Sequence, residues 1–255
     1  MKQIIDAHIH LDQYNRDDIL RFAMEETVQY AISVSSNLES CKKTKKLSQD
    51  FAFIKAAYGY HPEQSIPSDK SLSALFTWMH ENQESMTAIG EVGLPHYIRR
   101  KSPSCIPLEP YMEILELFII FAKKLEKPVI LHSIYEEADI AIHLLEKHSV
   151  SKAHFHWFKG NPKTIEQMIS NGYSISITPD LLYKEKTRQL VKLYPIENIM
   201  VETDGPWSLE GPYHHQKTVP MMIHDTVHYL SAIKNITLPD MYNQLLKNTK
   251  NFYSI

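Results

Sequence analysis

Short apolar runs alternate with longer amphipathic stretches along the whole chain. The runs are rich in Val, Ile and aromatic residues and are bounded by Gly, Pro, Asn or Asp, which is typical of strands. We expect strands at 4–10, 28–35, 53–59, 86–93, 128–133, 152–158, 173–177 and 198–204. The stretches between them, such as 17–26, 107–126 and 135–149, carry apolar residues at three- and four-residue spacing. This spacing predicts helices with one buried face.

Eight alternations of strand and helix indicate parallel strands joined by helical crossovers. We therefore predict a single (β/α)₈ TIM barrel domain that spans residues 1–255, a usual length for that fold. An open doubly wound sheet is the alternative. It usually has fewer strands and a glycine-rich phosphate loop, and the chain contains neither GxGxxG nor GxxxxGK[ST].

Composition limits the partners and the compartment. The formal net charge is −3, so binding to a polyanion would need a local basic patch or a bound metal. Cys41 and Cys105 belong to no CxxC pair and suit unpaired thiols in a reducing compartment. No apolar run has the length of a signal peptide, and the run 115–122 is much shorter than the roughly 20 residues that span a bilayer. We expect a soluble cytoplasmic protein with no membrane contact and no obligate protein partner.

The first predicted strand carries three polar side chains on one face. Asp6, His8 and His10 alternate with Ala7 and Ile9, so they point the same way if the segment is extended. Two histidines at this spacing can reach one metal ion. The alternative is a pair of surface or core histidines, although three aligned polar groups that are buried need partners.

Further residues of the kinds that bind metals lie near the ends of later predicted strands. They are Glu91, His132, His156 and Asp204. In a (β/α)₈ barrel these carboxyl ends meet at one mouth, which holds the active site. Each residue alone is as well explained as a satisfied buried polar group. The complete set predicts a metal site.

These motifs resemble the TatD family of metal-dependent hydrolases, often described as TatD-like DNases, among the amidohydrolase-type barrels. The resemblance includes DAHIHLD at the start, GYHP at 59–62, GEVGL at 90–94, PVILHS at 128–133, FHWFKG at 155–160 and ETDGPW at 202–207. It implies one ion on His8, His10 and Asp204, a second on His132 and His156, and Glu91 as the bridge between them.

The implied mechanism is hydrolysis by a metal-activated bridging water, with Glu91 and Asp204 as catalytic residues and Asp204 as proton acceptor. The ligand types favour Zn²⁺, Mn²⁺, Ni²⁺ or Fe²⁺, whereas TatD-like nucleases are commonly regarded as Mg²⁺-dependent. Two such ions, two carboxylates and a hydroxide leave a net charge of about +1, which favours phosphate esters over neutral amides.

Residues near the predicted mouth are candidates for substrate contact. They are His61 in GYHP, Arg99 in the basic run 99–101, and Lys159 in the turn 158–160. We expect the basic run to be a loop, which either is merely solvated or steers a nucleic acid. Tyr97, Trp157 and Trp207 either stack on a base or pack in the core.

Other polar residues near the proposed ligands are candidates for supporting roles. Asp6 and Glu202 each precede a ligand by two residues and would orient a histidine or belong to an internal polar network. His154 has no assigned partner and is interpreted as structural.

The chain departs from the family pattern at three places near the mouth. Pro95 stands where an acidic residue is common, Ile134 replaces a frequent arginine, and the turn 158–160 reads Phe-Lys-Gly. These departures leave the substrate open. DNA or another phosphodiester is the leading prediction; a small phosphoester, lactone or amide is the second; a non-catalytic metal-binding protein is the third.

Overall fold

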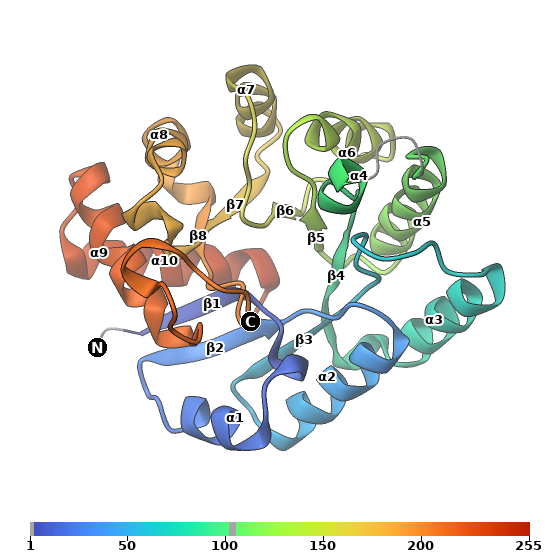
Figure 1. The fold of residues 1–255 in the computed structure, drawn as a ribbon, viewed down its shortest axis with the longest axis horizontal. Coiled ribbons are helices and arrows are strands. Elements are labelled where there is room, and N and C mark those ends of the chain that lie inside the picture. The colour runs from blue at the N-terminus through green and yellow to red at the C-terminus, as the bar shows by residue number, and fades with distance from the viewer. Residues whose placement is uncertain (1–2, 102–105) are drawn as a thin grey trace.

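The computed structural model describes residues 3–101 and 106–255, and eight parallel strands form its centre (Figure 1). The strands are paired in sequence order, and the backbone N–H of Asp204 donates to the carbonyl of His8 at 3.0 Å, which brings the last strand back to the first. Their bounds are β1 Ile4–Ile9, β2 Val28–Ser33, β3 Ile54–Tyr58, β4 Met86–Gly93, β5 Val129–His132, β6 Ala153–Phe155, β7 Ser174–Ile177 and β8 Ile199–Val201. The predicted (β/α)₈ barrel is confirmed.

Several strands end earlier than predicted. The segments 4–10, 152–158 and 198–204 lose one to three residues at their C-terminal ends, so that His10, His156 and Asp204 lie just beyond regular strands. Asp204 adopts a left-handed backbone with φ of 52°, which a strand does not permit. Regular strand pairing therefore ends at the positions where the polar side chains point into the mouth of the barrel.

Helices surround the barrel (Figure 1). Their bounds are α1 Arg16–Ala23, α2 Leu38–Asp50, α3 Asp69–Glu81, α4 Tyr97–Lys101, α5 Glu109–Lys124, α6 Glu136–Lys147, α7 Pro162–Ser170, α8 Glu185–Leu193, α9 Ile223–Lys234 and α10 Leu238–Tyr253. Asn161 caps α7 by accepting from the Thr164 N–H at 3.0 Å, and Pro110 occupies the first turn of α5, as its missing N–H allows.

The expectation of a loop at 99–101 is wrong. These residues end the short helix α4, whose first N–H groups are bonded by the Glu63 carboxylate. A charge run specifies solvation but not backbone conformation, and this capping acid lies more than thirty residues earlier in the chain.

Apolar side chains fill the space between the sheet and the helices, and a smaller cluster lies beside β1, β5 and β8. There Ile5, Ile130 and Met200 pack with Tyr253 at the end of α10. Cys41 is a free buried thiol, and burial raises its pKa to about 12. Cys105 lies outside the described residues. No described helix is both long and apolar enough to cross a membrane.

Candidate metal centre

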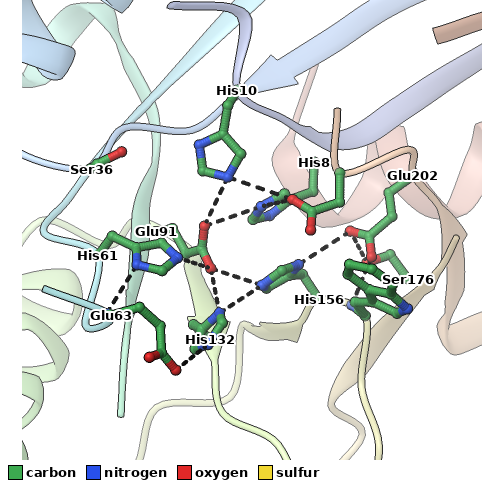
Figure 2. A network of polar contacts seen from close by, with 12 residues as sticks. His8, His10, Ser36, His61, Glu63, Glu91, His132, His156, Ser176 and Glu202 are labelled. Atoms are coloured by element: carbon green, nitrogen blue, oxygen red, sulfur yellow. Dashed lines mark hydrogen bonds and ion pairs between the residues drawn. The ribbon is translucent and has the colours of Figure 1, made fainter. Parts of the chain in front are cut away.

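The Glu91 carboxylate lies at the centre of a group of imidazole rings (Figure 2). It is fully buried on β4. Its Oε2 lies 3.2 Å from His8 Nε2 and 3.3 Å from His10 Nε2. Its Oε1 lies 2.8 Å from both His132 Nδ1 and His156 Nε2. Each oxygen of one carboxylate thus faces a different pair of histidines.

Asp204 and His61 extend the two halves of this cluster. Asp204 Oδ1 lies 3.3 Å from His8 Nε2 and 3.5 Å from His10 Nε2, so it belongs to the half that β1 supplies. His61 Nε2 lies 3.3 Å from Glu91 Oε1, on the side of His132. The structure therefore brings all six predicted ligands together, with His61 beside them.

The facing atoms of the β1 half are buried and short of partners. His8 Nε2, His10 Nε2, Glu91 Oε2 and Asp204 Oδ1 have no hydrogen-bond partner among the described residues. A buried polar atom without a partner is costly, and such atoms rarely converge by chance. The His8, His10 and Glu91 donor atoms lie within 4.8 Å of one another, as do those of His61, Glu91 and His132. Imidazole nitrogens and carboxylate oxygens are a donor set that fits divalent transition metals.

Neighbouring groups of opposite charge in the cluster keep one another ionised. Burial acts to raise the pKa of Glu91, but His61, His156 and His8 outweigh it and keep that pKa well below its usual range. Burial acts to lower the pKa of His156, yet Glu91 and Glu202 raise it well above the ordinary value. Glu91 is thus an ionised carboxylate that is neutralised from both sides.

Metal uptake is expected to release protons. Burial lowers the pKa of His10, but the nearby carboxylates of Asp204 and Glu91 raise it to about 10 in the metal-free chain. A ligating imidazole must be neutral, so metal affinity should rise with pH. The part of this rise that comes from deprotonation of His10 should level off above about pH 10. We expect about a tenfold gain per pH unit for each proton released. Calorimetry in two buffers with different ionisation enthalpies counts these protons, and equal heats in both would contradict the expectation.

Glu63 is a site residue that sequence reasoning missed. Its Oε1 lies 3.3 Å from His132 Nε2, on the ring edge opposite Glu91 (Figure 2). The same carboxylate accepts backbone N–H groups of His96 at 2.6 Å, Tyr97 at 2.7 Å and Ile98 at 2.8 Å. Burial opposes ionisation, but His132 and these N–H groups lower the Glu63 pKa to about 2. The available signal was an acid two residues after His61, at the predicted end of the third strand.

The supporting roles expected for Asp6 and Glu202 have different outcomes. Asp6 accepts from the His8 backbone N–H and from Thr203 and not from an imidazole ring, so of its two expected roles the internal polar network is the one that its contacts match. Burial raises the pKa of Asp6 to about 8. Glu202 does face a ring, because its Oε2 lies 3.8 Å from His156 Nδ1.

A cavity of about 630 Å³ opens above the cluster. His61 and Lys159 line it, and the Lys159 ammonium lies 4.3 Å from the centre of the Trp157 ring. Arg99 is not among the lining residues, because its Nη1 lies 3.3 Å from Glu137 Oε1 on α6. Lys101, two residues further along α4, lines the cavity instead.

Exposed aromatic rings also line this cavity. Tyr97 is 44% exposed and Trp207 is 50% exposed, so neither ring is a core residue. Ile134, at the position of the family's frequent arginine, lines the cavity as well. The mouth thus combines two lysines with flat apolar surfaces.

Comparisons with known proteins place the chain in a family. The family model described as TatD related DNase matches residues 5–254. An uncharacterized metal-dependent hydrolase of Haemophilus influenzae is 37% identical over 253 residues, which cover 99% of this chain and all of that protein. Human deoxyribonuclease TATDN3 is 27% identical, over 96% of this chain and 92% of its own length. The crystal structure of YJJV, a TatD homologue from Escherichia coli K12, superposes with a TM-score of 0.87 at 23% identity and covers 100% of this chain and 99% of its own. The chain belongs to the TatD family of metal-dependent hydrolases.

Proposed function

We propose that this chain is a phosphodiesterase that hydrolyses DNA, with residues 1–255 acting as one catalytic domain. The observation that carries the proposal is the Glu91 carboxylate, shared between two pairs of histidines beneath a cavity lined by lysines and exposed aromatic rings. The choice of substrate is supported by a relative that is named a deoxyribonuclease and that matches this chain over nearly its whole length.

The residues fit two divalent ions. His8, His10 and Asp204 would hold one, His132 and His156 the other, and Glu91 would contact both. Such ions, when bound, lower the pKa of a water molecule and offset negative charge on the reacting phosphate. Four imidazoles favour Zn²⁺, Mn²⁺, Fe²⁺ or Ni²⁺ over Mg²⁺, which prefers oxygen ligands.

The remaining steps belong to side chains of this chain. The rings of His10 and His8 keep the Asp204 pKa below its ordinary value despite burial, so the carboxylate is ionised and has a free lone pair with which it can accept a proton. The Lys101 and Lys159 ammonium groups provide positive charge for a phosphate backbone. Tyr97 and Trp207 offer ring faces on which bases stack.

The substrate is proposed to be recognised through contacts within the cavity and not through the overall charge of the protein. With a net charge of −3, the chain has no general attraction for DNA, and the cavity volume suits a few groups of a substrate at a time. All proposed ligands come from one chain, so the centre needs no partner chain to be complete. The buried unpaired thiol of Cys41 supports action in the cytoplasm.

The test is reconstitution followed by a substrate screen. Metal-free protein would be loaded separately with Zn²⁺, Mn²⁺, Ni²⁺, Fe²⁺ and Mg²⁺ and assayed on single- and double-stranded DNA, RNA, p-nitrophenyl phosphate esters and a lactone. We expect metal-dependent cleavage of DNA, reduced when Lys101 or Lys159 is replaced by Ala. Lys186→Ala, on α8 outside the cavity, is the control. Turnover of the lactone or the small phosphomonoester alone would replace the nuclease proposal by the second candidate.

A further inference from the structure

A chain of hydrogen bonds crosses the barrel interior behind the metal centre. It begins at Tyr253, the last residue of α10, whose hydroxyl lies 2.7 Å from His154 Nδ1. His154 Nε2 lies 2.5 Å from Ser176 Oγ, and Ser176 Oγ lies 2.6 Å from Glu202 Oε2. His154 and Glu202 are fully buried, and Tyr253 is 3% exposed. This series of hydrogen bonds therefore runs through the protein interior and not through solvent.

The direction of each bond follows from the donors available. A carboxylate only accepts, so the single Ser176 hydroxyl proton goes to Glu202. Ser176 Oγ must then accept from His154 Nε2–H, which leaves His154 Nδ1 as the acceptor for the Tyr253 hydroxyl. The other acceptor near that hydroxyl is the Ala7 carbonyl at 3.4 Å, a much weaker contact. All three bonds point toward Glu202.

Glu202 in turn is held on both oxygens. Its Oε1 accepts the Trp157 backbone N–H at 2.7 Å, and its Oε2 accepts from Ser176 while lying 3.8 Å from His156 Nδ1 (Figure 2). The 3.8 Å separation is longer than a hydrogen bond, so this contact is electrostatic: the carboxylate favours a proton on Nδ1, and Nε2 is then the nitrogen that would give up its proton to bind an ion. That Nε2 is the atom 2.8 Å from Glu91 and 3.3 Å from His132 Nδ1.

We propose that Tyr253 is a positioning residue for the metal centre, which acts through His154 and Ser176 to hold Glu202 against the ring of His156. This inference rests on the proposed function, because it takes His156 as a metal ligand. The last turn of α10 lies on no strand and away from the mouth. The proposal is that this turn controls the ligand geometry of one ion.

The test measures metal affinity and needs no substrate. Zn²⁺ dissociation constants would be obtained by competition with a chromophoric chelator for the full chain and its variants. Groups that orient a ligand cost about 10–100-fold in affinity when removed, so Ser176→Ala should weaken one of the two sites to that extent. Tyr253→Phe, two bonds further away, should weaken the same site by about 3–10-fold.

A matched control separates positioning from packing. Tyr194 is also fully buried, and its hydroxyl donates to the Tyr173 carbonyl at 2.7 Å, outside this chain of bonds. Tyr194→Phe removes the same group and should leave both Zn²⁺ affinities unchanged. The double variant Tyr253→Phe/Ser176→Ala should bind no more weakly than Ser176→Ala alone, because the bonds act in series. Additive losses, or equal affinities for Tyr253→Phe and Tyr194→Phe, would overturn the proposal.

A second measurement requires no substitution. In the ¹⁵N-labelled wild-type protein, the His154 ring should be the Nε2–H tautomer, with Nδ1 unprotonated. The opposite tautomer would overturn the bond directions and the proposal with them. Protein that binds Zn²⁺ as expected but cleaves no phosphodiester would contradict the nuclease function and leave the role of Tyr253 standing.

Discussion

Replacing Asp204 by Asn is expected to lower kcat by about 10³-fold or more while the protein stays folded. Asn keeps the size of the side chain and tolerates the left-handed backbone that Asp204 adopts at φ of 52°. It removes the negative charge that faces His8 and His10 and the group proposed to accept a proton. The loss should therefore be chemical, and it should appear mainly in kcat.

Steady-state kinetics on the substrate found in the screen, with circular dichroism as the check on folding, would measure this effect. Asp18→Asn is the matched control, since Asp18 is also a buried residue but pairs with Lys217 and Arg21, and none of the three lines the cavity. Rates close to wild type for Asp204→Asn would remove Asp204 from the mechanism.

Replacing Glu91 by Gln is expected to abolish activity and to reduce bound metal to one ion or fewer per chain. The present carboxylate offers one oxygen to each half of the centre, whereas an amide offers one oxygen and an NH₂ donor. The NH₂ group cannot ligate a cation, so one half loses its shared ligand. Because neutral Gln also leaves four buried histidines without their carboxylate, we expect affinity at the remaining site to fall at least about 100-fold.

Metal content per chain, measured by atomic emission after dialysis, gives the stoichiometry directly. Thermal unfolding with and without Zn²⁺ adds a second measure, because an ion that binds only the folded state stabilises it by about 4 kcal/mol at a thousandfold excess over Kd. That gain should shrink in Glu91→Gln and persist in Glu116→Gln, whose carboxylate pairs with Lys147 and His148 away from the centre. Two tightly held ions in Glu91→Gln would refute the shared-ligand role.

The barrel and the six clustered residues were predictable because they depend on local patterns and one rule of the fold. Alternation in β1 places His8 and His10 together, and the rule that strand ends converge brings Glu91 and Asp204 to them. The resemblance then implied how the residues divide between two ions. The contacts that each Glu91 oxygen makes agree with that division.

Other features depended on pairings that no local pattern encodes. Arg99 pairs with Glu137 on α6, so a charge near the mouth does not reach the cavity. Glu63 is held by N–H groups of α4, a helix that the sequence pattern did not predict. His154 looked isolated because its partners, Ser176 and Tyr253, come from β7 and α10.

The capping of α4 by Glu63 has a thermodynamic consequence. One carboxylate ties the helix that carries Tyr97 and Lys101 to the His132 ring, so the outer wall of the cavity and one half of the centre share an anchor. With His132 as the metal ligand proposed above, an occupant that displaces α4 would change the affinity of His132 for the ion, and linkage requires the ion to change the occupant's affinity by the same factor. Saturation curves for the ion and for the occupant of the cavity are therefore not independent, and each has to be reported at a stated concentration of the other.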